Sequence, residues 1–303
     1  MTACSRSHVV VTGSSSGIGR ATVLRLAATG CHVYAGVRRI ADAPAAPTGG
    51  SGEITPLLLD VTDPAQIAAA ADAVAGHTGS AGLDGLVNDA GIGVFGPLEI
   101  IPIEQFRQQL EVNVTGQLAV TQALLPLLRR ARARIVLIGS IGTRFTPPCT
   151  GPVSASKSTI ATMAEALRQE LAPWNIGVVL IEPASIHTEA VDKLARDAER
   201  LLREADPRAR ALYEDDFRRF VDVGLARERN GSPPRVVAQA VADALTVPRP
   251  HARYLVGKDA LPMAALAAVL PTRMLDALRR KVVHQPAPGS RLLPGPAEQG
   301  VPR

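Results

Sequence analysis

Short apolar runs rich in Val, Ile and Leu alternate with longer, Ala-rich segments through most of the chain. The short runs are typical of buried strands, and the longer segments repeat apolar residues every three or four positions, as amphipathic helices do. We expect strands at residues 8–12, 32–37, 54–60, 83–88, 134–140, 176–182 and 253–256. We expect helices at residues 18–28, 64–75, 103–130, 154–171 and 233–245.

This regular alternation of strands and helices predicts the fold class. Each strand–helix–strand unit returns to the same sheet by a right-handed crossover, so the strands run parallel and helices cover both faces. We predict a single α/β domain over residues 1–284, a Rossmann-like doubly wound parallel sheet with a helical substrate lid. Ligands bind such sheets at the carboxyl ends of the strands.

Four segments interrupt the alternation. Residues 41–52 are rich in Pro, Ala and Gly and predict a loop. Residues 185–232 form a long, charged helical insertion, which is where we expect the substrate lid. Residues 261–284 predict a C-terminal helical segment, and residues 285–303 predict a disordered tail.

Composition narrows the functional classes. The net charge of +5 comes from scattered arginines without a basic stripe or interleaved aromatics, which excludes a nucleic-acid partner. Three cysteines show no metal-ligand spacing and leave one unpaired, so we expect no metal and a cytoplasmic location. The apolar stretch 261–270 is too short to span a bilayer. Residues 261–283 can lie on a membrane surface, although capping the pocket or forming an interface is the favoured role.

A glycine-rich loop follows the first predicted strand and opens the first helix. Residues 12–19 read TGSSSGIG, so glycines allow a tight turn and a close backbone approach to a pyrophosphate. The start of the helix supplies unpaired N–H groups and a dipole that favours an anion. The loop residues expected to bind a dinucleotide are Gly13, Ser15, Gly17, Ile18 and Gly19.

The end of the second predicted strand indicates which dinucleotide binds. A carboxylate at this point normally accepts hydrogen bonds from the adenosine ribose of NAD. Here the sequence is AGVRR, and the guanidinium of Arg38 offers a charged fork for a 2′-phosphate instead. The sequence therefore predicts NADP(H) in preference to NAD(H).

Taken with further spaced motifs, the chain from about residue 7 to residue 257 resembles the short-chain dehydrogenase/reductase family. The resemblance implies an oxidoreductase with a small-molecule substrate. It assigns Asp60 and Val61 to the adenine ring, Asn88, Ala90 and Gly91 to the cofactor, and Thr188 to the nicotinamide carboxamide. It assigns Asn113 to a proton-relay water, Ser140 to the substrate oxygen, and Lys157 to the nicotinamide ribose and the activation of a tyrosine.

Three positions depart from the family pattern. Asp89 replaces the second asparagine of an Asn-Asn-Ala-Gly element, and Ala184 replaces a glycine. The largest departure is Val153, which stands four residues before Lys157, where the family places its tyrosine. Residues four apart share a helix face, so tyrosine and lysine there form an acid usable near neutral pH. Loss of a positioned general acid typically costs about 100- to 10,000-fold in rate.

Other residues are poor substitutes for that tyrosine. Tyr254 and Lys258 repeat the spacing, but we expect them on a strand that contains a glycine, where they lie far apart. Tyr34 is expected on the adenosine side and Tyr213 in the lid. His187 neighbours the predicted carboxamide-binding threonine and is a weaker candidate acid.

Three functions remain open on the sequence. The first is an NADP(H)-dependent carbonyl reductase or alcohol dehydrogenase for an apolar substrate, in which Lys157 donates a proton through a water. The second is a non-redox isomerase, dehydratase or cyclase that uses the same pocket. The third is a catalytically inactive dinucleotide-binding protein. The long helices at 103–130 and 154–171 resemble the family's dimerisation helices, so we expect a homodimer or homotetramer.

Overall fold

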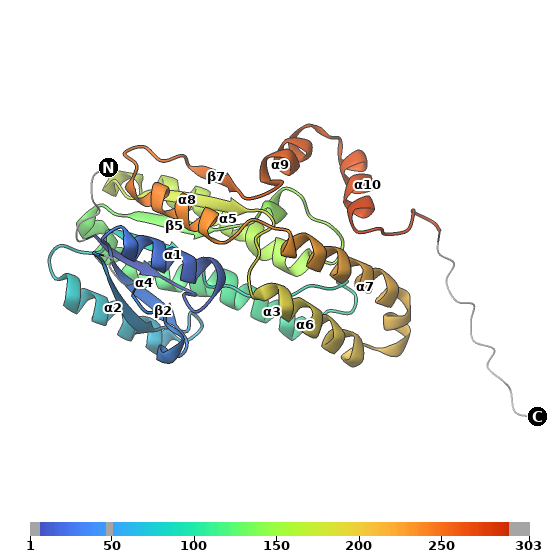
Figure 1. Cartoon of the computed structure of the whole chain (residues 1–303), viewed down its shortest axis with the longest axis horizontal. Helices are drawn as coiled ribbons and strands as arrows, with labels where there is room; N and C mark the ends of the chain where they lie inside the picture. Colours follow the sequence, from blue (N-terminus) through green and yellow to red (C-terminus); the bar gives the residue numbers. More distant parts are fainter. Residues whose placement is uncertain (1–6, 47–50, 291–303) are drawn as a thin grey trace, which may run out of the picture.

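The computed structural model describes residues 7–46 and 51–290, without the side chains of residues 190–192. Its strands form one parallel sheet in the order β3-β2-β1-β4-β5-β6-β7 (Figure 1). The strands are β1 His8–Val11, β2 His32–Val37, β3 Glu53–Leu58, β4 Gly85–Asn88, β5 Arg134–Ile138, β6 Gly177–Pro183 and β7 Arg253–Val256. Each of the expected strands is present, with ends within two residues of those predicted, and the doubly wound fold is confirmed.

Helices cover both faces of the sheet and bury the alternating side chains of its strands. Val9 and Val11 pack with helices α1 and α8 on one face, whereas Val10 packs with α2, α4 and α5 on the other. These helices are α1 Gly17–Ala28, α2 Pro64–Thr78, α4 Gln117–Ala131, α5 Gly151–Glu170 and α8 Arg235–Thr246. β1 lies between β2 and β4, so the chain reverses its direction of winding there and leaves a crevice at the carboxyl ends.

The helix expected over residues 103–130 is present, but it contains a π-helical turn that the sequence did not predict. Helix α3 spans Ile103–Leu110, a π-helical turn spans Glu111–Gly116, and α4 follows. At the end of the π-helical turn the backbone runs against Val61, where a Cβ on Gly116 would lie 2.7 Å from the Val61 carbonyl oxygen. Such π turns are frequent at functional sites because they redirect side chains and backbone groups.

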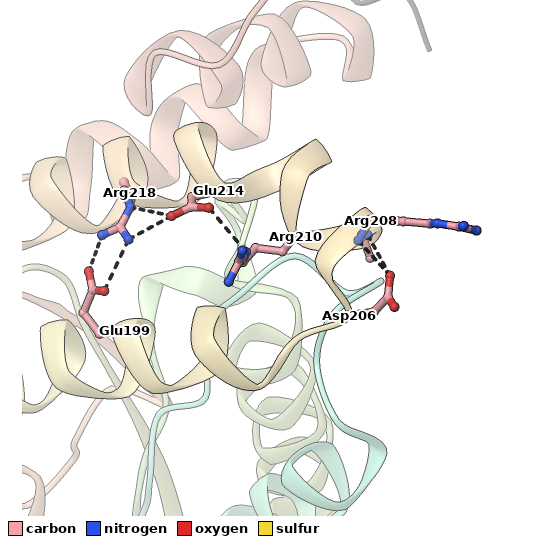
Figure 2. A network of polar contacts seen from close by, with 7 residues as sticks. Glu199, Asp206, Arg208, Arg210, Glu214 and Arg218 are labelled. Carbon is pink, nitrogen blue, oxygen red and sulfur yellow. Dashed lines mark hydrogen bonds and ion pairs between the residues drawn. The ribbon is translucent and has the colours of Figure 1, made fainter. Parts of the chain in front are cut away.

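The expected lid contains two helices, α6 Ala190–Glu204 and α7 Pro207–Arg229, which pack side by side at one end of the sheet (Figure 1). A separate apolar cluster that includes Phe217 and Phe220 of α7 joins them to the body. Figure 2 shows Arg218 of α7 bonded both to Glu214 on its own helix and to Glu199 on α6. Asp206 caps α7 by accepting hydrogen bonds from the next backbone N–H groups.

The C-terminal segment forms α9 Ala260–Val269 and α10 Thr272–Val282, which follow β7 at one edge of the fold (Figure 1). Arg279 of α10 joins this segment to the body by donating to the Arg144 carbonyl oxygen at 3.0 Å. Of the expected loop at 41–52, residues 47–50 lie outside the described residues, and of the expected tail, residues 291–303 do. Within the described ranges, no helix combines the length and the apolar character needed to cross a membrane.

Candidate active site

A cavity of about 1120 Å³ opens at the carboxyl ends of the strands. It brings together twelve of the predicted site residues: Gly13, Ser15, Gly17, Ile18, Arg38, Asp60, Val61, Ala90, Gly91, Ser140, Lys157 and Thr188. Gly19, Asn88 and Asn113 are not among the residues that line it.

The glycine-rich loop forms one end of the cavity, and its glycines are required by geometry. Gly13 has φ +69°, and a Cβ there would lie 2.8 Å from the Cα of Ala90. Gly19 has no room for a side chain either, because a Cβ would lie 2.3 Å from the Gly13 carbonyl oxygen. The Gly13 contact shows that the loop lies close against the backbone that follows β4, the neighbour of β1 in the sheet.

The first helix presents its N-terminus to the cavity and already holds an anionic group. The backbone N–H of Gly17 donates to the Glu189 carboxylate at 3.1 Å. A carboxylate at this point shows that the helix start accepts negative charge, as a pyrophosphate requires. The loop therefore fits a dinucleotide: its glycines leave room for close approach, and its N–H groups are aimed at an acidic group.

The two arginines that follow β2 have different surroundings. Arg39 pairs with Asp42 at 2.8 Å, whereas Arg38 is exposed and lines the cavity. At the same end, Asp60 accepts hydrogen bonds from the backbone N–H and hydroxyl of Thr62. A guanidinium thus faces the region where the sequence predicts the adenosine ribose.

Asn113 is buried and holds the cavity wall rather than lining it. Its Nδ2 donates to the carbonyl oxygen of Ile92 at 3.0 Å and to the Ser156 hydroxyl at 3.1 Å, and its Oδ1 accepts from the Ile92 N–H. Gln109, which the sequence did not single out, makes parallel contacts with Ile92 and Ser156. Asn88 is likewise buried, and its amide donates to Thr121 at 2.8 Å.

The opposite end of the cavity contains Ser140, Val153 and Lys157. The Ser140 hydroxyl accepts from the Gly142 N–H at 3.0 Å, and a hydroxyl that accepts in this way still has its own hydrogen to donate. Lys157 Nζ donates to the carbonyl oxygen of Ile138 at 2.7 Å. Burial lowers the pKa of Lys157 to about 8, and the charge of Asp89 opposes that shift.

The three tyrosines are engaged elsewhere, and none is among the residues that line this cavity. Tyr34 is buried beside His8, and burial raises its pKa to about 12. The Tyr213 hydroxyl donates to Glu99 at 2.5 Å, and the Tyr254 hydroxyl accepts from the His251 N–H. His187 is exposed and does not line the cavity.

Three cavity carboxyls, those of Asp89, Glu111 and Glu228, were missed by the sequence prediction of the site, and two of them have raised pKa values. Asp89 lies directly after β4, and burial raises its pKa to about 7. Glu228 accepts from the Ile186 N–H at 3.2 Å, and burial raises its pKa to about 7 as well. The position of Asp89 within the N-D-A-G motif was a usable signal. Glu228 had no comparable signal, because it reaches the cavity only where the last turn of α7 returns to the sheet.

Comparison with known proteins agrees with this arrangement. The family model described as short chain dehydrogenase matches residues 7–199. The chain is 34% identical to an NADPH-dependent 3-dehydrocapnine reductase of Ornithobacterium rhinotracheale over 89% of this chain and 94% of that protein. It is 34% identical to 11-beta-hydroxysteroid dehydrogenase type 2 of Oryctolagus cuniculus, with 91% of this chain and 69% of that protein covered. It is also 32% identical to retinol dehydrogenase 5 of Mus musculus, with 93% and 91% covered.

Among solved structures, a short chain dehydrogenase from Burkholderia cenocepacia in complex with NADP superposes with a TM-score of 0.68. The two chains are 25% identical, and the match covers 92% of this chain and 98% of the other. The chain belongs to the short-chain dehydrogenase/reductase family of oxidoreductases.

Proposed function

We propose that the protein is an NADP(H)-dependent oxidoreductase that interconverts a carbonyl and an alcohol on an apolar substrate, with Lys157 as the proton donor in place of the missing tyrosine. The observation that carries the proposal is the position of Lys157. Its ammonium lines the same cavity end as Ser140 and Val153, whereas the three tyrosines bond to groups elsewhere.

The choice of NADP(H) rests on the basic side chain at the end of β2. Arg38 faces the cavity and Arg39 is occupied by Asp42, so Arg38 is the residue that would hold a 2′-phosphate. The pyrophosphate would bind at the start of α1, where Gly17 now donates to a carboxylate. The NADPH dependence of the dehydrocapnine reductase and the bound NADP of the Burkholderia protein support the same choice.

Ser140 and Lys157, which line the cavity with Val153, have different roles toward the substrate oxygen. When bound, NADPH supplies a hydride to the carbonyl carbon. Ser140 donates a hydrogen bond to the substrate oxygen, and Lys157 supplies the proton through a water beside Val153. With a pKa of about 8, Lys157 is mostly protonated at pH 7 and can release its proton more easily than an ordinary lysine.

The apolar character of the substrate is supported by the cavity wall and by the relatives. Apolar side chains line the cavity, including Ile92, Leu110, Val112 and Ile186. The names of two relatives specify a hydroxysteroid and a retinol, both of which are bulky and apolar. We also propose a homodimer or homotetramer through α4 and α5, where Trp174 is 48% exposed beside a groove that leucines line together with polar side chains.

The test is NADPH oxidation by the purified protein with a panel of apolar ketones and aldehydes, repeated for Lys157→Arg. Arginine keeps the charge but does not release its proton, so we expect kcat to fall by about 100-fold or more. Lys193→Arg, a change at an exposed lid lysine, is the matched control and is expected to leave kcat unchanged. An unchanged kcat in Lys157→Arg would refute Lys157 as the acid. Substrate turnover without NADPH oxidation would favour the non-redox function instead.

A further inference from the structure

The carboxyl group of Asp89 has no part in the chemistry described so far, yet the sheet places it next to the lysine. Asn88 at the end of β4 pairs with Leu137 of β5, so Asp89 and Ile138 are the next residues on neighbouring strands. Neighbouring strands lie about 4.8 Å apart. The carbonyl oxygen of Ile138 is the group that accepts from Lys157 Nζ at 2.7 Å. Asp89 therefore follows the strand next to β5, whose last carbonyl oxygen holds the ammonium of Lys157 from helix α5.

The backbone and side chain of Asp89 are both fixed. Its N–H donates to the Thr12 hydroxyl at 3.0 Å, and the nearby backbone N–H of Gly19 lowers the pKa of its carboxyl, against the effect of burial. A Cβ on Gly19 would lie 2.7 Å from Asp89 Oδ2, so the carboxylate fits against a glycine that has no room for a side chain. The carboxylate is thus confined beside the start of α1, from where its charge reaches Lys157.

The charges of Asp89 and Lys157 each shift the pKa of the other group. The pKa of Asp89 is raised by burial and lowered by Lys157, and that of Lys157 is lowered by burial and raised by Asp89. Among the described residues, no carboxylate lies within ion-pair distance of Lys157, so the interaction is one of nearby charges without a direct salt bridge. The other titratable and charged groups that line the cavity are Arg38, Asp60, Arg107, Glu111 and Glu228. Asp89 is the charge that acts on Lys157.

We propose that Asp89 is a positioning residue that keeps Lys157 in its ammonium form while ligands fill the cavity and exclude water. This inference rests on the proposed role of Lys157 as the acid. A neutral asparagine, as in the resembling motif, would leave the lysine without a counter-charge in a site that disfavours its charged state. Two of the three departures from the family pattern then belong together: Val153 removes the phenol, and Asp89 adds an anion that supports the remaining acid.

The reduction adds one hydride and one proton to the substrate carbonyl. The carbonyl carbon gains a hydride from NADPH, the C=O double bond becomes a single bond, and the oxygen gains the proton that leaves Lys157. Lysine is left as a neutral amine and regains a proton from solvent, and NADPH leaves as NADP⁺. Asp89 neither gives nor takes a proton in this step.

The decisive experiment measures the titration of Lys157 directly in the full-length protein. The chain has four lysines, so ¹³C-methylation of the amines and NMR titration give few signals, and Lys157→Arg identifies the one of interest. We expect that signal to titrate near pH 8 in the wild type and about one pH unit lower in Asp89→Asn, an isosteric change. Asp72→Asn, which removes the same charge on the exposed side of α2, is the control and is expected to leave it unmoved.

The outcomes separate this inference from the proposed function. An unshifted Lys157 titration in folded Asp89→Asn overturns the role of Asp89, whether or not the protein reduces any substrate. A shifted titration together with a full rate in Lys157→Arg supports the charge relation and refutes Lys157 as the acid. If Lys157 is the acid and Asp89 supports its charge, the pH above which kcat falls moves to a lower value in Asp89→Asn. In a Lys157→Arg background, Asp89→Asn then has no further effect on kcat. A further effect on kcat in that background would overturn action through Lys157.

Discussion

At the phosphate end of the cavity the contacts depend on backbone geometry, whereas at the proton-donor end they depend on the identity of a few side chains. Gly13 and Gly19 are held against neighbouring backbone with no room for a Cβ, and Gly17 presents its N–H to an anion. Around Val153 the backbone is the regular helix α5, which accepts a tyrosine about as readily as a valine. If the two ends have the proposed roles, cofactor binding and proton transfer can change independently within one fold.

The largest expected effect is at the phosphate end, with Gly13→Val. The backbone there has φ +69°, and the added Cβ would meet Ala90 at 2.8 Å. Strain and displacement of the loop together should weaken NADPH binding by more than about 100-fold. Calorimetric titration measures the affinity, and Gly76→Ala is the control because a Cβ there meets no atom within 4 Å. Equal binding by both variants would contradict a backbone-determined phosphate site.

The next effect is at the proton-donor end, with Val153→Tyr. The new phenol would stand one helical turn before Lys157 and line the cavity, so the lysine ammonium would favour the phenolate and make the phenol a usable acid. We expect kcat for ketone reduction to rise by about 10- to 100-fold with little change in NADPH affinity. Steady-state kinetics with NADPH titration separate the two quantities. A fall in kcat would show that the valine makes room for an essential part of the present mechanism.

The sequence predicted the phosphate end more completely than the proton-donor end, and the difference has a physical origin. A glycine at a positive φ is a local requirement, so Gly13 and Gly17 could be identified from the loop and its flanking strand and helix. Glu228 could not, because its carboxylate meets Ile186 across 42 residues through the packing of the lid. Asn113 was found by its motif, but its burial beside Ser156 depends on the π-helical turn, which no periodicity signalled.

A smaller effect is expected at the adenosine end of the cavity, where we propose that the charge of Arg38 selects NADP(H) over NAD(H). Arg38→Ala should weaken NADPH binding by about tenfold and leave NADH binding nearly unchanged, because only NADPH carries the 2′-phosphate. Arg39→Ala is the matched control, since Arg39 pairs with Asp42 and does not line the cavity. Equal losses for NADPH and NADH in Arg38→Ala would refute a phosphate contact and return NAD(H) as the cofactor.

The smallest expected effect concerns the lid carboxylate that meets the phosphate loop. Glu189 accepts from the Gly17 N–H, so an incoming pyrophosphate must displace a group of like charge from the start of α1. Glu189→Gln removes that charge and should tighten NADPH binding by about threefold at low salt, with a smaller gain at high salt because the repulsion is screened. Glu170→Gln, an exposed change at the end of α5, controls for net charge. Weaker binding in Glu189→Gln would instead assign the carboxylate a supporting contact with the cofactor, and the phosphate end would then depend on a side chain as the proton-donor end does.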